Sequence, residues 1–339
     1  MTPTSGLVSQ LATTVVGRGR ELEVVLAALD AGRHVLLEGP PGTGKSTLLR
    51  AIAEATGQGF EFVEGNAELT PARLVGHFDP ALVLSEGYSE KVFVDGPLVA
   101  ALRAGALLYV EELNRVPEDT LNTLITVMSE GELHVPRLGR IVAEPGFHLV
   151  AAMNPFDAVG TARISSAVYD RCCRLVVDYQ SAPDEARIVE ATLTAEGTPG
   201  APDDEWQRRM VEVVRRTRTH PDVRVGSSVR GAIDATLVAA SLSRLRGLTT
   251  VDDGVTLDAA LVALSGRVRV REGATRTADD IVRALVAEVF AAPAPPAEGA
   301  PGPDGGGTTP DGTGTDGRPP GARGGAEPGK PDAPQARRG

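Results

Sequence analysis

The sequence predicts a three-layer α/β domain with a parallel five-stranded sheet, followed by a small all-helical domain and a disordered C-terminal tail. Over roughly the first two hundred residues, short apolar runs alternate with helical patterns. Helical periodicity then continues alone, and proline and glycine dominate the last stretch of the chain. Because strands that alternate with helices are buried on both faces, this order is typical of a parallel sheet covered by helices.

The expected strands of the sheet are short apolar runs that are separated by helical patterns and turns. They lie at His34–Glu38, Phe60–Val63, Ala106–Glu111, Phe147–Met153 and Leu175–Tyr179. The first of these runs leads directly into a helical pattern over residues 44–56. After an N-terminal arm of residues 1–14, the α/β domain is therefore expected to cover residues 15–193.

The rest of the chain shows no strand pattern. A break rich in Gly, Pro and Asp at 194–205 is the expected linker, and apolar residues at helical spacing predict a helical domain over 206–290. Its arginines are interpreted as a solvated helix face; they are Arg208, Arg209, Arg215, Arg216 and Arg218. Residues 291–339 lack large apolar side chains, so we expect a disordered tail, either a spacer or a partner-docking segment.

Composition and charge exclude several classes of protein. The formal net charge of -11 argues against a protein that coats duplex nucleic acid. The two cysteines are the adjacent Cys172 and Cys173, which exclude a disulfide scaffold, supply no metal-ligand spacing and are expected to be small buried residues. No signal peptide and no apolar run of about 18 residues is present. We therefore expect a soluble, cytoplasmic protein without membrane insertion.

The segment from Gly39 to Ser46 fits the spacing G-x-x-x-x-G-K-[ST] of a P-loop and lies between an expected strand and an expected helix. Its glycines let successive backbone N–H groups face phosphates, Lys45 adds a point charge, and Ser46 offers a hydroxyl to magnesium. A turn that only linked strand to helix would not need the lysine. The expected cofactors are ATP and Mg2+, and the expected nucleotide-binding residues are Gly39, Pro40, Pro41, Gly42, Thr43, Gly44, Lys45, Ser46 and Thr47.

A second acidic element is expected at the end of a neighbouring strand. The run Leu107–Glu111 ends in an acid and is followed directly by Glu112. We expect Glu111 to hold magnesium together with Ser46, and Glu112 to deprotonate the attacking water. The alternative for two adjacent glutamates is a solvated strand end.

These residues resemble the AAA+ ATPases, specifically the MoxR-like branch, over roughly residues 15–290. Glu111–Arg115 is similar to the branch's D-E-I-N-R, and Val92–Leu98 to its F-x-x-G-P-L. Ala152–Pro155 resembles the sensor-one N-P, Tyr169–Arg171 the D-R-F that carries the arginine finger, and Gly226–Arg230 the sensor-two G-a-S-P-R. The resemblance implies an AAA+ P-loop domain with a helical lid and an ATPase activity.

The resemblance also implies roles for individual side chains. Asn154 would hydrogen-bond the attacking water or the γ-phosphate, and Arg230 would contact the nucleotide of its own subunit. Arg171 would act in trans on a neighbouring subunit, with Arg163 as the alternative finger. For Arg171 and Arg230 the other interpretation is an ordinary surface ion pair. The sequence departs from the family at Glu111, where aspartate is usual, and at Cys172, where phenylalanine is usual.

A site completed by a neighbour requires a ring, and the family implies a hexamer and a partner with a von Willebrand factor A domain. An inserted helix is expected within 70–93 and a hairpin within 130–147. Phe78 and Tyr88 are the aromatic candidates for facing a client or the pore, with core packing as the alternative. We favour a chaperone-like, ATP-driven remodeller; a nucleotide-gated binding module with slow hydrolysis and a nucleic-acid motor are the alternatives.

Overall fold

The computed structural model describes residues 4–155 and 164–291 of the chain. The described residues all belong to one compact unit, Met1–Ala294. The alternative finger Arg163, and the expected tail from residue 292 onward, lie outside the described residues.

The α/β domain is built on a parallel sheet with the strand order β2-β5-β8-β1-β9. The strands are β1 (His34–Glu38), β2 (Phe60–Glu64), β5 (Leu107–Glu111), β8 (His148–Met153) and β9 (Cys172–Val176). Every neighbouring pair is parallel. The expected five-stranded parallel sheet is thus confirmed, and four of its strands lie where the apolar runs predict them.

The expected position of the last strand was wrong. The run Leu175–Tyr179 was expected, but β9 begins at Cys172 and ends at Val176, because its register pairs His34 with Cys172 and Glu38 with Val176. At the end of the strand the N–H of Val177 donates to the carbonyl of Glu38, at 2.7 Å, and the chain leaves the sheet. The run of apolar residues does not show where an edge strand stops pairing, and Cys173 is exposed rather than buried.

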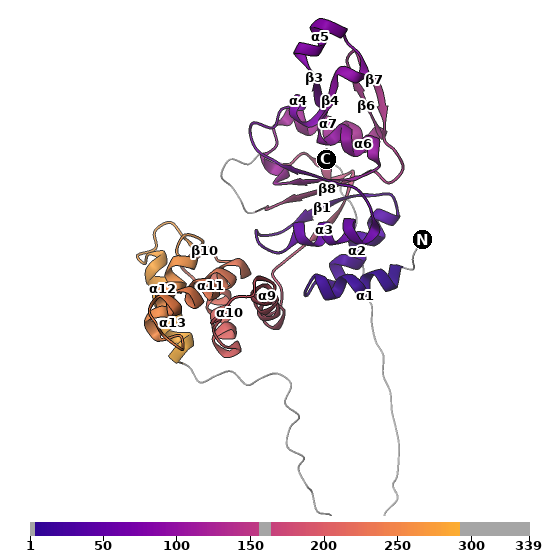
Figure 1. The fold of residues 1–339 in the computed structure, drawn as a ribbon. Coiled ribbons are helices and arrows are strands. Elements are labelled where there is room, and N and C mark those ends of the chain that lie inside the picture. The colour runs from indigo at the N-terminus through magenta and orange to yellow at the C-terminus, as the bar shows by residue number, and fades with distance from the viewer. Residues whose placement is uncertain (1–3, 156–163, 292–339) are drawn as a thin grey trace, which may run out of the picture. The chain divides into compact units, whose positions relative to one another are not determined.

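Helices cover both faces of the sheet and make three layers (Figure 1). On one face lie α1 (Thr4–Thr14), α2 (Gly19–Asp30) and α3 (Lys45–Thr56); on the other lie α6 (Pro97–Ala104) and α7 (Glu118–Glu130). Successive side chains of a strand point to opposite faces, so Val35 and Leu37 pack with the first group and Leu36 with the second. The expected N-terminal arm is therefore a helix, whose Leu11 is buried in the first group.

Two small additions lie side by side at one end of the α/β domain (Figure 1). The first contains α4 (Pro71–Val75), β3 (Gly76–Phe78), α5 (Pro80–Glu86), the 3-10 helix η1 (Glu90–Val92) and β4 (Phe93–Asp95). The second is the antiparallel hairpin of β6 (Glu132–Val135) and β7 (Gly139–Val142). The Arg137 guanidinium of this hairpin lies 3.9 Å from the ring centre of Tyr88, which joins the two additions. An inserted helix and a hairpin thus lie in the segments where they were expected.

The two aromatic candidates of the first addition differ in their surroundings. The ring of Phe78 lies 5.0 Å from that of Tyr88 and 5.0 Å from that of Phe93, and Phe78 packs against the core. Tyr88 is 51% exposed. Of the pair, Phe78 serves packing, and Tyr88 presents its ring at the surface.

The helical part has five long helices. They are α9 (Ala182–Glu196), α10 (Asp204–Thr219), α11 (Val229–Leu245), α12 (Asp253–Leu264) and α13 (Ala278–Ala291). Their buried side chains form one cluster, to which α9 contributes Val189 and Leu193. Helix α9 thus packs with the helical part although it precedes residue 194. The segment 194–205, expected as a linker, contains the end of α9 and the start of α10.

This part also contains two short strands, although none was expected there. Strand β10 (Val223–Val225) pairs antiparallel with β11 (Arg269–Val270). Strands this short show no periodic pattern in the sequence. The two strands that pair are also far apart in the chain, so only the tertiary structure reveals them. No helix within residues 4–155 and 164–291 is long and apolar enough to cross a membrane.

We predict that His34 makes the folded state sensitive to mild acid. The ring accepts a hydrogen bond from the N–H of Leu149, at 3.0 Å, and burial lowers the pKa of His34 from 6.5 to about 4. Between these values the unfolded chain binds a proton that the folded chain does not, so stability falls as the pH drops from about 6.5 to 4. The loss should reach roughly 3 kcal/mol.

Urea unfolding of the wild type and of His34→Asn at pH 7 and pH 4.5 measures this effect. The asparagine can accept the same hydrogen bond without titrating, so the variant should lose less stability on acidification. The same change at the exposed His77 is the control and should leave the pH dependence as it is in the wild type. Equal acid sensitivity in the wild type and His34→Asn would contradict the prediction.

Candidate nucleotide-binding site

The P-loop connects β1 to α3 and has a backbone that requires glycine. Gly42 and Gly44 have φ values of +74° and +81°, in the left-handed region. A Cβ on Gly39 would lie 1.9 Å from the carbonyl oxygen of Val177, and one on Gly42 would lie 2.2 Å from Ser228 Oγ. Residues 39–44 form the loop, and Lys45 to Thr47 form the first turn of α3. All nine expected nucleotide-binding residues therefore lie in one strand–loop–helix connection.

Lys45 is buried at the centre of this loop. Its ammonium donates to the carbonyl oxygens of Gly39, at 3.0 Å, and Pro40, at 2.8 Å. Burial lowers the pKa of Lys45 to about 8, while the nearby Glu111 carboxylate acts in the opposite direction. The loop thus concentrates a positive charge and the N-terminal end of α3 at one point, which favours an anion such as a phosphate.

Ser46 and Glu111 converge beside Lys45. The Ser46 hydroxyl lies 3.2 Å from each oxygen of the Glu111 carboxylate and 3.4 Å from the Tyr109 hydroxyl. A hydroxyl and a carboxylate are the hard oxygen donors that magnesium takes, usually together with phosphate oxygens of a nucleotide. Within the described residues, no group of three or more His, Cys, Asp or Glu side chains could hold a metal ion by itself. The pair Ser46 and Glu111 therefore fits an ion that is shared with a bound phosphate.

Tyr109 is a neighbour of this pair that sequence reasoning missed. Its side chain is fully buried, and burial raises the pKa of its hydroxyl. Residues two apart on a strand share a face, so the position of Tyr109 relative to Glu111 was a usable signal.

Glu112 and Asn154 follow neighbouring strands, β5 and β8, at the same edge of the sheet. Glu112 has φ of 54°, a left-handed conformation that turns the chain sharply out of β5 and costs a residue with a side chain about 1–2 kcal/mol. Its carboxylate forms an ion pair with Arg115 Nη1 at 2.9 Å. The side chain of Asn114 donates to the carbonyl of Asn154, at 3.3 Å, and so joins the two strand ends.

The two expected arginines lie in different surroundings. The Arg171 guanidinium donates to the carbonyl of Ala167, at 2.9 Å, and to the hydroxyl of Ser129, which attaches it to α7 and to α8 (Ser166–Tyr169). Arg230 lies in the first turn of α11, and its Cδ would be 3.8 Å from a Cβ built on Gly42. Arg230 is thus beside the P-loop of its own chain, whereas the hydrogen bonds of Arg171 hold it to α7 and α8.

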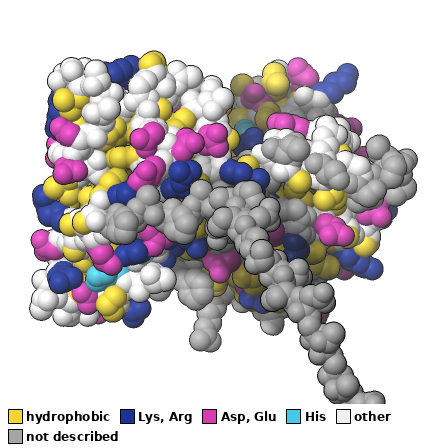
Figure 2. Space-filling view, turned by 90° about the horizontal axis from the view of Figure 1, so that it is seen from below, with side chains coloured by type: hydrophobic (Ala, Val, Ile, Leu, Met, Phe, Trp, Pro, Cys, Tyr) yellow, Lys and Arg dark blue, Asp and Glu magenta, His cyan; other side chains and the backbone are white. Residues whose placement is uncertain are grey.

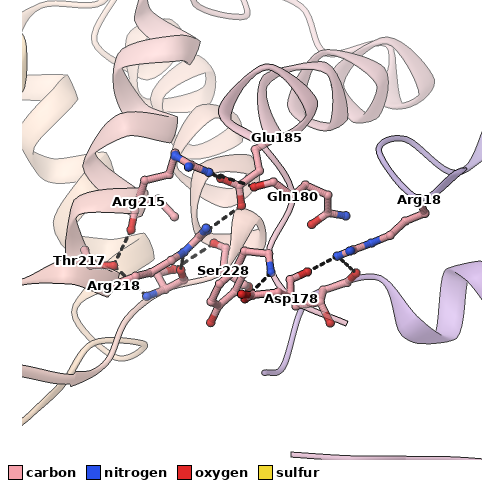
Figure 3. A network of polar contacts seen from close by, with 12 residues as sticks. Arg18, Asp178, Gln180, Glu185, Arg215, Thr217, Arg218 and Ser228 are labelled. Carbon is pink, nitrogen blue, oxygen red and sulfur yellow. Dashed lines mark hydrogen bonds and ion pairs between the residues drawn. The ribbon is translucent and has the colours of Figure 1, made fainter. Parts of the chain in front are cut away.

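A polar network lies between the P-loop and the helical part, and its first member is Arg18 (Figure 3). The Arg18 guanidinium donates to the carbonyl of Thr43 in the P-loop, at 2.8 Å, and to that of Asp178 after β9, at 2.5 Å. It thereby ties the loop to the segment that leads into α9. The sequence offers no local signal for this role, because the partners are 25 and 160 residues away.

The second part of the network surrounds the fully buried Glu185 of α9 (Figure 3). Its carboxylate accepts from Arg215, at 2.9 Å, and from Arg218, at 2.7 Å. Arg218 also donates to the carbonyl of Ser227, at 2.7 Å, next to Ser228. The interpretation of Arg215 and Arg218 as a solvated helix face was therefore wrong, because a buried carboxylate requires partners of opposite charge.

The fold and this site define a P-loop AAA+ α/β domain with a helical region after it. Residues 34–172 match the model of the AAA domain of the dynein-related subfamily. Among curated proteins, the chain is 32% identical over 241 residues to the gas vesicle ATPase GvpN of Haloferax mediterranei, a match that covers 66% of this chain and 65% of that protein. It is 29% identical over 248 residues to the uncharacterized protein YeaC of Bacillus subtilis, covering 67% and 74%.

Among solved structures, a mutant of RuvB from Thermotoga maritima superposes with a TM-score of 0.51 at 18% identity, over 73% of this chain and 70% of that chain. This likeness concerns the fold alone. The sequence likenesses support an AAA+ ATPase. The MoxR-like branch stays a prediction from the motifs.

We predict that Gly42→Ala impairs ATP binding. The added Cβ would lie 2.2 Å from Ser228 Oγ in a backbone with φ of +74°, so the loop or Ser228 must move. Affinity should fall at least about tenfold in a titration with a fluorescent ATP analogue. Gly57→Ala is the matched control: its φ is +67°, but no atom lies within 4 Å of the added Cβ. Unchanged affinity in Gly42→Ala would argue against this placement of the nucleotide.

We also predict that Glu185→Gln destabilises the folded chain by about 2–3 kcal/mol in urea unfolding, because Arg215 and Arg218 lose their counter-charge in a buried setting. In the control Asp258→Asn, the lost ion pair with Arg246 is roughly half exposed, so the cost should stay below about 1 kcal/mol. Equal effects of the two substitutions would contradict the prediction.

Proposed function

We propose that this chain is a magnesium-dependent ATPase of the MoxR-like branch that works as a ring and remodels a partner or client protein complex. The observation that carries the proposal is the convergence of Ser46 and Glu111 at 3.2 Å beside the buried Lys45. The match to an AAA domain model and the likeness to a relative named an ATPase support hydrolysis rather than binding alone.

In this proposal each side chain of the site has its own role in ATP hydrolysis. The P-loop N–H groups and Lys45 hold the phosphates. Ser46 and Glu111 would hold Mg2+, which would supply positive charge to neutralise the phosphates. Glu112 accepts a proton from the attacking water, and Asn154 orients that water. The water oxygen bonds to the γ-phosphorus as the bond to the bridging oxygen breaks, and ADP and phosphate leave.

The extra methylene of Glu111 is compatible with this work. Aspartate is usual at this position in the family, yet the Glu111 carboxylate has both its oxygens within 3.2 Å of the Ser46 hydroxyl. In our proposal the longer side chain still reaches Ser46 and shares a magnesium ion with it. This contact favours hydrolysis over the gated binding module in which Glu111 slows turnover.

The proposal of a ring rests on the two arginines. Arg230 lies beside its own P-loop and contributes to the nucleotide site of its own subunit, whereas Arg171 is held on α7 and α8. In our proposal Arg171 reaches the γ-phosphate of a neighbouring subunit and stabilises charge in the transition state. Six subunits, as in the family that the motifs resemble, would place one such arginine at every interface.

We propose that the ring contacts its client through the two small additions to the α/β domain. The contact between Arg137 and Tyr88 joins these additions. Helix α5 carries Leu84, which is 90% exposed, and Tyr88 follows it. Exposed apolar side chains grouped in this way are suited to contact another protein. A partner with a von Willebrand factor A domain and a cytoplasmic location are further parts of the proposal and rest on the resemblance and the composition.

A nucleic-acid motor is the less favoured alternative. The chain is acidic, with a net charge of -11. On the face shown in Figure 2, basic and acidic side chains are interspersed. A surface that binds a phosphate backbone is expected to concentrate basic side chains instead.

We predict that ATP hydrolysis per subunit rises with protein concentration and then saturates, because each site is completed by a neighbour. Arg171→Ala should lower kcat at least about a thousandfold without loss of ATP binding. Glu112→Gln should bind ATP and hardly hydrolyse it. The control is Arg267→Ala, which removes an exposed ion pair with Asp234 and a hydrogen bond to the Ala263 carbonyl, both within the helical part.

The measurement is steady-state phosphate release with magnesium over a wide range of protein concentration. It distinguishes the ring ATPase from the gated binding module. ATP binding without turnover at any concentration, with a folded and ring-forming sample, would favour the gated binding module. Turnover that does not depend on concentration or on Arg171 would contradict the ring.

A further inference from the structure

A buried carboxylate, that of Glu38, lies directly before the P-loop. Glu38 is the last residue of β1 and is only 2% exposed. The Tyr169 hydroxyl donates to its Oε1 at 2.9 Å, and Arg174 Nε donates to its Oε2 at 2.6 Å. Both oxygens of the carboxylate are thus engaged, each by a different element.

These two partners lie on either side of Arg171. Tyr169 is the last residue of α8, two residues before Arg171, and Arg174 lies in β9, three residues after it. Register places Arg174 opposite Leu36 on β1, and Leu36 and Glu38 share a face of that strand. One carboxylate therefore fixes both ends of the short segment that presents Arg171.

On its other side, Glu38 is joined by one peptide bond to the P-loop. The N–H of Gly39 donates to the carbonyl of Met153, at 3.1 Å, and the carbonyl of Gly39 accepts from Lys45. A displacement of the loop at Gly39 would therefore move the backbone of Glu38, and with it the carboxylate on which Tyr169 and Arg174 depend.

The geometry of this contact is demanding because the carboxylate is buried. An ionised carboxylate out of water is stable only while its hydrogen-bond partners stay in place. Loss of Arg174 would remove the counter-charge of Glu38, and loss of the Tyr169 hydroxyl would remove the hydrogen bond to Oε1, so the arrangement resists small shifts of α8 and β9. Burial and the Glu38 carboxylate both raise the pKa of Tyr169, so its hydroxyl keeps the proton that it donates.

We propose that Glu38 is a positioning residue for the arginine that a subunit offers to its neighbour, acting through Tyr169 and Arg174 on the segment that carries Arg171. The inference rests on the proposed function, since it requires Arg171 to act in trans. It links the P-loop of one subunit to the transition state in the next one. A nucleotide-dependent shift at Gly39 would change where the neighbour receives its arginine.

Steady-state kinetics of Tyr169→Phe test the proposal. The substitution removes one hydroxyl and keeps the ring, so kcat should fall about tenfold, as expected for one lost hydrogen bond to a charged group. KM for ATP should stay within about twofold, since the P-loop that binds ATP is unchanged. Arg174→Met should behave alike, and Arg174→Lys, which keeps the charge, should recover part of kcat. Arg267→Met controls for removal of an arginine from an ion pair.

Mixed rings show whether the defect acts on the neighbour. Subunits with Glu112→Gln are expected to bind ATP and hardly hydrolyse it, but they still offer Arg171 to wild-type neighbours. Adding Tyr169→Phe to these inactive subunits should lower the ATPase activity of the wild-type sites in the mixture. Adding Arg171→Ala instead gives the lowest activity expected when no arginine is offered. A defect within one subunit alone would leave the mixture unaffected by Tyr169→Phe.

The outcomes separate this inference from the proposed function. If Arg171→Ala abolishes turnover while Tyr169→Phe and Arg174→Met leave kcat unchanged, the role of Glu38 is wrong and the ring ATPase stands. An increase in KM with kcat unchanged would also overturn it. If the wild type hydrolyses no ATP or does not depend on Arg171, both fall together.

Discussion

The pairing of parallel strands at one edge of the sheet is the constraint on which the rest of the molecule depends. Strand β8 lies between β1 and β5, with Leu37 opposite Ala152 and Val110 opposite Ala151. Since parallel strands end at the same edge, the P-loop, the two glutamates and Asn154 all emerge together. Residues more than one hundred positions apart in the chain thereby form one site.

Buried charged groups lie at this edge and in the adjoining helix α9. Lys45 is held by carbonyl oxygens of its own loop, Glu38 by Tyr169 and Arg174, and Glu185 by two arginines. Each buried charge is tolerated because hydrogen-bond partners surround it. These contacts attach the P-loop to α8 and β9, and the segment after β9 to the helical part. Hydrogen bonds and ion pairs of charged side chains therefore hold the site in place together with apolar packing.

Local signals predicted the parts of the fold that are decided locally. Apolar runs predicted four of the five strands, and the spacing of glycines and Lys45 predicted the P-loop, because a left-handed turn and a phosphate-facing charge need those residues at those positions. The last strand was misplaced because the apolar run used to predict it begins only at Leu175. An edge strand is exposed at several positions, and its extent follows from its partner. Helix α9 was assigned to the α/β domain because its order in the chain does not reveal that Val189 packs with the helical cluster.

By itself, then, the sequence determined the class of the fold, the P-loop and the identity of the acids beside it, because each of these features depends on residues that are close together in the chain. Only the tertiary structure decided which partners the charged side chains have. The Glu38 carboxylate accepts from the Tyr169 hydroxyl at a separation of 131 residues, Arg18 donates to the backbone carbonyl of Asp178 at 160, and Arg218 pairs with Glu185 at 33. A charged side chain looks the same in a sequence whether it faces water or a buried partner. The cost of burying it selects the partner, and that cost arises only when the chain is folded.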